Sequence, residues 1–91
     1  MPKYVIERAV PGVGRMSTDE LHGLSAASNK VLQSLEGDIQ WVHSYAAEDR
    51  LFCVYNAESQ ELIREHARRG GFPCDHIRQV SAIIDPVTGE A

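Results

Sequence analysis

The chain has 91 residues, of which 43% are hydrophobic and 24% are charged, and this is the size and composition of one small globular domain. Nine basic and thirteen acidic residues give a net charge of −4 at pH 7, which argues against the broad basic surface of a nucleic-acid-binding protein. No apolar run approaches the roughly 18 residues of a membrane helix, and the N-terminus MPKYVIERAV lacks a signal-peptide core, so we expect a cytoplasmic protein.

The first part of the chain predicts a strand, a turn and a helix. β-branched and aromatic residues favour a strand over Lys3–Arg8, and glycine and proline mark a turn over Val10–Arg15. Ser17 and Glu20 have the spacing of a capping box, which predicts the start of a helix of about 17 residues. Gly37 is placed to end it. The apolar stripe of this helix is Leu21, Leu24, Ala27 or Ser28, Val31, Leu32 and Leu35.

The second part predicts a hairpin, a helix and a last strand. Strands are expected over Ile39–Tyr45 and Arg50–Tyr55, close enough in sequence to pair as a hairpin. Asn56 is the expected N-cap of a helix over Ala57–Arg69, and the last strand is expected over His76–Ile84. The apolar stripe of this second helix is Leu62, Ile63, His66 and Ala67.

The order β-α-β-β-α-β is the ferredoxin-like pattern, an α+β fold. Right-handed crossovers place both helices on one face of a four-stranded antiparallel sheet and leave the other face open. We expect one domain over residues 1–86 and a frayed C-terminal tail over residues 87–91. Because so small a chain buries a thin core, a homodimer is the expected assembly. The open face is expected either to meet a second copy of the chain or to cover a ligand.

The sequence WVHSY lies within the expected second strand. Side chains alternate along a strand, so Trp41, His43 and Tyr45 are expected on one face, and Val42 and Ser44 on the other. The small residues suit packing beneath helices. The three large, amphipathic residues suit the open face, a dimer interface or the wall of a pocket.

The register of the hairpin stays open from the sequence alone. A three-residue turn would bring Cys53 and Tyr55 beside His43, whereas a two- or four-residue turn would bring Phe52 and Val54 there instead. A slip of one residue exchanges the complete set of neighbours, so the surroundings of His43 depend on the turn.

Histidine, carboxylate and cysteine side chains suggest metal binding, although no HxH, HxxxH or CxxC motif is present. Imidazole suits nickel, copper and zinc, and Glu7 could orient His43 or share its cation if both lie on one face. His66 instead fits either a helix C-terminus or a cavity between helix and sheet. The candidate ligands of this site are His43, His66, Glu7, Tyr45 and Cys53.

A second candidate is a small metal corner made by Cys74 and His76. These residues are two apart, so an extended chain would place them on one face, with Asp75 between them. A plain surface turn at Asp75–His76 is the alternative. Cys53 and Cys74 are expected to be free thiols, because the chain shows no export signal.

Several segments resemble a family of small bacterial domains that includes a nickel-binding, nickel-responsive protein. They are PKYVIER, IQWVHSY, FCVY, IREHARRGGFP and the closing IDP, and the resemblance extends over roughly residues 1–86. It implies a ferredoxin-like fold, a dimer and a nickel ion as the bound group. His43 and His66 lie inside the two most distinctive of these segments.

Three functions therefore remain open. The first is a binding protein, rather than an enzyme, for nickel or a similar divalent ion, acting in storage, buffering or sensing. The second is a domain that binds a small organic molecule, or a cofactor-free enzyme, with His43 as acid–base group beside Trp41 and Tyr55 in a ligand pocket. The third is an interaction module with a dimer interface and no organised site.

Overall fold

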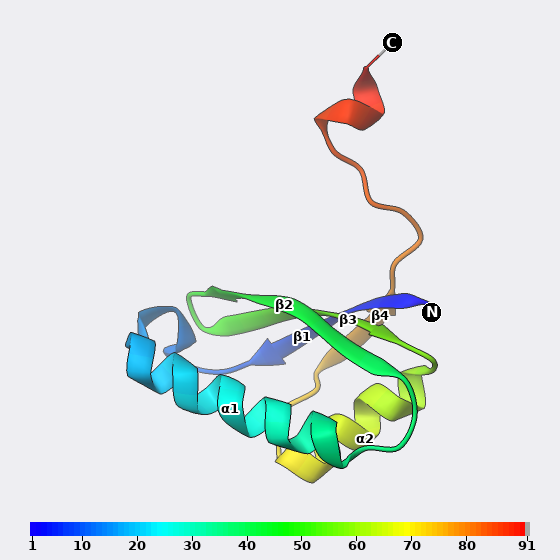
Figure 1. The fold of residues 1–91 in the computed structure, drawn as a ribbon. Helices are drawn as coiled ribbons and strands as arrows, with labels where there is room; N and C mark the ends of the chain where they lie inside the picture. Colours follow the sequence, from blue (N-terminus) through cyan, green and yellow to red (C-terminus); the bar gives the residue numbers. More distant parts are fainter. Residues whose placement is uncertain (91) are drawn as a thin grey trace.

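The computed structural model describes residues 1–90, and its elements follow the predicted β-α-β-β-α-β order. The four strands form one antiparallel sheet in the order β2-β3-β1-β4, and both helices lie on the same face (Figure 1). The predicted ferredoxin-like α+β fold is confirmed. The elements are β1 Lys3–Ala9, η1 Val13–Arg15, α1 Thr18–Ser34, β2 Ile39–Ala47, β3 Arg50–Ala57, α2 Gln60–Gly70, β4 His76–Gln79 and η2 Pro86–Gly89.

The hydrophobic core lies between the sheet and α2. The predicted stripe of α2 is confirmed, since Ile63, His66 and Ala67 are buried. By contrast, α1 has no fully buried residue, although its capping box between Ser17 and Glu20 forms as predicted. Neither helix has the length and apolar character of a membrane span within residues 1–90. The core cluster consists of Tyr4, Ile6, Cys53, Tyr55, Ala57 and Ile63.

The boundary between β3 and α2 differs from the prediction. Asn56 is not a helix cap but the strand partner of Lys3, whose Nζ donates to its Oδ1 at 2.8 Å. Ala57 continues the strand because its side chain is fully buried in the core. Ser59 caps α2 instead, and its hydroxyl accepts a hydrogen bond from the backbone N–H of Leu62.

The last strand is also shorter than predicted and has only four residues. Its partner β1 begins at Lys3, whose carbonyl accepts a final hydrogen bond from the N–H of Val80 at 2.8 Å. Beyond Val80 the structure of residues 1–90 offers no partner strand, and the chain leaves the sheet as an extended arm that ends in η2 (Figure 1). Ile83 and Ile84 lie on this arm and are 70% and 79% exposed.

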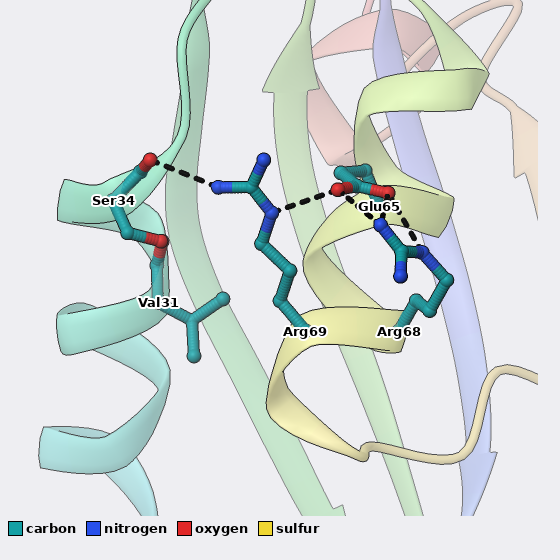
Figure 2. A network of polar contacts seen from close by, with 5 residues as sticks. All are labelled: Val31, Ser34, Glu65, Arg68 and Arg69. Atoms are coloured by element: carbon teal, nitrogen blue, oxygen red, sulfur yellow. Dashed lines mark hydrogen bonds and ion pairs between the residues drawn. The ribbon is translucent and has the colours of Figure 1, made fainter.

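The two helices are joined at one end by a network of charged side chains (Figure 2). Glu65 accepts hydrogen bonds from both Arg68 and Arg69, and Arg69 Nη1 donates to the carbonyl oxygen of Ser34 at 3.0 Å. Ser34 is the last residue of α1, so a cation meets the negative end of that helix. Because exposed ion pairs add little stability, apolar contacts remain the main source of helix packing.

The turn between β2 and β3 packs against η1, and Gly14 makes the contact possible. The N–H of Gly14 donates to the carbonyl oxygen of Glu48 at 2.8 Å. A Cβ atom at Gly14 would lie 2.6 Å from the backbone nitrogen of Glu48, closer than real Cβ contacts allow. Glu48 itself has a φ of 54°, the left-handed region, which a two-residue hairpin turn favours.

We therefore predict that Gly14→Ala destabilises the fold by about 1–3 kcal/mol, because backbone atoms must move to admit the methyl group. The matched control is Gly23→Ala on the exposed side of α1, where nothing lies within 4 Å of the added Cβ. That change should raise stability by roughly 0.5–1 kcal/mol, because alanine favours the helix. Urea denaturation measures both variants, and equal midpoints for the two would refute the argument.

Candidate functional site

A β-bulge in the middle of WVHSY decides which face each of its side chains occupies. Trp41 lies opposite Tyr55, whereas His43 lies opposite Val54, so the pairing shifts by one residue at Val42. The extra residue breaks the strict alternation of the strand. Trp41 therefore lies on the helix-covered face, and the prediction that it shares a face with His43 is wrong.

His43 and Tyr45 do lie together on the open face, with their ring centroids 4.9 Å apart. The hairpin has a two-residue turn, so Phe52 and Val54 are the strand neighbours of Tyr45 and His43. Of the two registers that the sequence left open, the structure has the one that places Phe52 and Val54, rather than Cys53 and Tyr55, beside His43. On the opposite face, Trp41 Nε1 donates to the hydroxyl of Ser44 at 2.9 Å.

The five candidate metal ligands are divided between the two faces of the sheet. His66 and Cys53 are buried beneath the helices. His43, Tyr45 and Glu7 belong to the open face, and Glu7 contacts Arg50, whose Nη1 lies 3.6 Å from its carboxylate. Within residues 1–90, no three His, Cys, Asp or Glu side chains come together in one chain as a metal centre.

Cys74 and His76, the second predicted metal corner, are also separated. Cys74 packs against the helix-side core, whereas His76 lies opposite Glu7 in the pairing of β4 with β1. The alternation of an extended strand does not apply, because β4 begins only at His76. Asp75 is used structurally, since its carboxylate accepts a hydrogen bond from the N–H of Ala9 at 2.6 Å. Both cysteines are free thiols, as predicted.

A pocket of about 240 Å³ lies between α1 and the sheet. Two of the three residues expected in a ligand pocket, Trp41 and Tyr55, line it, while His43 lies on the other face of the sheet. Its apolar wall includes Leu21, Leu24, Trp41, Leu51 and Phe72, and its polar groups include Arg8, Ser28, Tyr55 and His66.

Arg8 is the most unusual residue of this pocket, and it was not among the predicted site residues. Its side chain is only 3% exposed, yet no carboxylate lies within ion-pair distance of it among residues 1–90. Nη1 donates to the carbonyl oxygen of Pro73 at 2.5 Å, whereas Nη2 has no hydrogen-bond partner in the described part of the chain. The Phe72 ring lies 6.0 Å from the guanidinium carbon. The signal in the sequence was the alternation of β1, which puts Arg8 on the same face as Tyr4 and Ile6.

His66 lies beside Arg8 and is 1% exposed. Its Nε2 is 3.2 Å from the hydroxyl of Ser28, and its Nδ1 has no hydrogen-bond partner within residues 1–90. Its ring packs between Tyr55 and Phe72, with centroid distances of 5.6 Å and 5.2 Å. Burial, assisted by the cation of Arg8, lowers the pKa of His66 to about 4, so the imidazole is neutral at pH 7. Burial raises the pKa of Tyr55, so its phenol is neutral as well.

The lowered pKa of His66 predicts a loss of stability in mild acid. As pH falls, the unfolded chain takes up the proton near pH 6.5 and the folded chain only near pH 4. The contribution of neutral His66 to the free energy of unfolding is therefore fully present above about pH 6.5. It decreases progressively down to about pH 4, by up to about 3 kcal/mol in all. The measurement is the free energy of unfolding in urea at several pH values, for the wild type and for His66→Gln.

His66→Gln removes the titrating group and keeps an amide that can bond to Ser28. Glu20 and Glu65 also have lowered pKa values, held down by hydrogen bonds from Ser17 and from the two arginines, and they contribute equally in both proteins. The difference between the two stability curves therefore isolates His66. Parallel curves from pH 7 to pH 4 would mean that His66 is not held neutral by its surroundings.

Comparisons with known proteins point to one family. The family model described as nickel responsive protein SCO4226-like matches residues 4–80. The crystal structure of SCO4226 from Streptomyces coelicolor A3(2) superimposes with a TM-score of 0.72 and 18% sequence identity, covering 90% of this chain and 99% of that chain. At this identity the superposition shows a shared fold. No curated protein matches the sequence.

Proposed function

The chain belongs to the SCO4226-like family of nickel-responsive proteins, and from this membership we propose that it binds nickel or a similar divalent ion. Storage, buffering or sensing of the ion is the role that such binding would serve. We place it in the cytoplasm, where the free thiols Cys53 and Cys74 stay reduced. The observation that carries the proposal is the family match over residues 4–80, and the chemistry of the open face supports it.

The open face offers the side chains that nickel prefers. His43 and His76 are both exposed, and Glu7 lies opposite His76 on the neighbouring strand. Imidazole nitrogens with carboxylate oxygens suit a borderline divalent ion. His66 and Cys53 lie on the helix-covered face, but this face suits a divalent ion less well. The uncompensated cation of Arg8 would repel a second positive charge in a buried site there.

Residues 1–90 of one chain do not bring three such ligands together, so we infer that a second copy completes the site. A two-fold axis through the open face would bring equivalent histidines of two chains towards each other. Apolar residues also favour such an interface. Val42 and Tyr45 are 45% and 61% exposed on the open face, and they line a shallow depression there with Val5, Val54 and Ile83 of the arm.

Calorimetric titration of nickel into metal-stripped, tag-free protein tests the metal proposal. We expect saturable binding that weakens by roughly tenfold or more in His43→Ala or His76→Ala, because each change removes a ligand nitrogen. His22→Ala, on the exposed surface of α1, is the matched control and should bind like the wild type.

Two results would contradict this assignment. Absence of saturable binding in the wild type would remove the metal function. Loss of binding in His66→Gln, with normal binding in His43→Ala, would move the ligand set to the helix-covered face.

The dimer has a separate test in sedimentation equilibrium. We expect the wild type to sediment as a dimer and Tyr45→Glu to sediment as a monomer, because a buried carboxylate without a partner opposes the interface. Gln33→Glu, on an exposed position of α1, is the control with the same added charge and should remain dimeric. A wild-type monomer at every protein concentration would exclude the shared site.

A further inference from the structure

We propose that the pocket beneath α1 binds a small apolar monocarboxylate, with the carboxylate paired to Arg8 and the hydrocarbon part enclosed between α1 and the sheet. This site lies on the helix-covered face, away from the open face proposed for nickel. The inference therefore does not depend on metal binding. The ligand class follows from the charge, the unused hydrogen-bond donors and the size of the pocket.

The first argument is the charge of Arg8. A buried charge is costly unless an opposite charge or several hydrogen bonds compensate it, and arginine does not lose its proton in proteins. Arg8 is almost fully buried and has no carboxylate partner among residues 1–90. Of its five N–H groups, one on Nη1 donates to Pro73, and neither N–H of Nη2 has a partner among residues 1–90. A bound carboxylate would supply both the missing charge and the missing acceptor.

The second argument is that another unused polar atom borders the same pocket. His66 is held neutral, and its Nδ1 has no hydrogen-bond partner among the described residues. In the tautomer in which Ser28 donates to Nε2, Nδ1 carries a proton and is a second donor for an anion. The Tyr55 phenol, also neutral, lines the pocket next to these groups. Donors and neutral groups therefore surround this end of the pocket, and no Asp or Glu of the described residues 1–90 lines it.

The third argument is the size and character of the remaining wall. A pocket of about 240 Å³ is smaller than the about 300–1,000 Å³ of drug-sized sites but larger than the about 150 Å³ that holds benzene. The side chains of Leu21, Leu24, Trp41 and Leu51 make most of its wall apolar. A single ring or a short branched chain bearing one carboxylate fits this volume. A dianion such as phosphate would carry more charge than Arg8 balances and no apolar part for the wall.

Trp41 provides a direct signal, because it is the only tryptophan of the chain and lines the pocket. Benzoate and phenylacetate are titrated into metal-stripped protein at about pH 7, so that coordination to a metal cannot explain binding. We expect a saturable change in Trp41 fluorescence and a higher melting temperature. Benzyl alcohol, which has the ring but no charge, should bind roughly tenfold or more weakly, and inorganic phosphate should not compete.

Three variants separate the roles of charge and space. Arg8→Met removes the cation with little change of volume and should abolish the preference for phenylacetate over benzyl alcohol. Leu24→Trp fills the pocket, keeps Arg8 and should weaken both compounds, as read by calorimetry because it adds a tryptophan. Arg64→Met removes an exposed arginine whose Nη2 donates to Gln60, and the variant should bind like the wild type.

Two outcomes would overturn the proposal. One is the absence of saturable binding of either carboxylate to the wild type. The other is equal affinity for phenylacetate and benzyl alcohol, which would mean that the cation plays no part. Both comparisons use the wild type, so they remain decisive even if Arg8→Met does not fold. A folded Arg8→Met protein that kept its preference for the acid would count against Arg8 as the partner.

Discussion

The bulge at Val42 is the constraint on which the division of chemistry in this protein depends. Without it, strict alternation would put Trp41 and His43 on one face of the sheet. The single extra residue turns the tryptophan towards the helices, where it becomes a pocket wall, and leaves the histidine on the open face beside Tyr45. Because a sheet separates the two faces completely, each can carry its own chemistry. One presents exposed imidazoles that suit a cation, and the other presents a buried guanidinium that suits an anion.

The two faces also differ in how strongly electrostatics acts on them. Charges on the open face are screened by water. The ion pair between Glu7 and Arg50, with 3.6 Å between Oε1 and Nη1, lies on this face. On the helix-covered face, the charge of Arg8 is removed from solvent, so its electrostatic interaction with neighbouring groups is much stronger. Together with desolvation, it keeps His66 neutral at physiological pH. A neutral imidazole avoids a second buried positive charge beside Arg8, and for this reason the folded chain protonates His66 only near pH 4.

The sequence predicted the fold well because its signals are local. The capping box at Ser17, the stripe of α2 and the order of the elements all follow from residues close together in the chain. The predictions that were wrong concern features that depend on pairing between segments far apart in the sequence. Asn56 has the chemistry of a helix cap, but its pairing with Lys3 keeps it in β3. The bulge has no residue signature in WVHSY, so the face of Trp41 was not predictable. The alternation of β1 predicts the face on which Arg8 lies. Its lack of a counter-ion among residues 1–90 depends on segments far away in the sequence, so no local pattern predicts it.

The absence of any fully buried residue in α1 has a consequence for the energetics of the whole domain. The apolar stripe of α1 faces the pocket, whereas the stripe of α2 is buried against the sheet. We therefore expect α1 to contribute less than α2 to the free energy of cooperative unfolding. Its amides should exchange with solvent through a low-energy local opening, while those of β1 and β3 require global unfolding. A molecule that filled the hollow would complete the core and bring α1 into the same cooperative unit. Occupancy would then be reported by slower exchange along a 17-residue helix, well beyond the residues in contact.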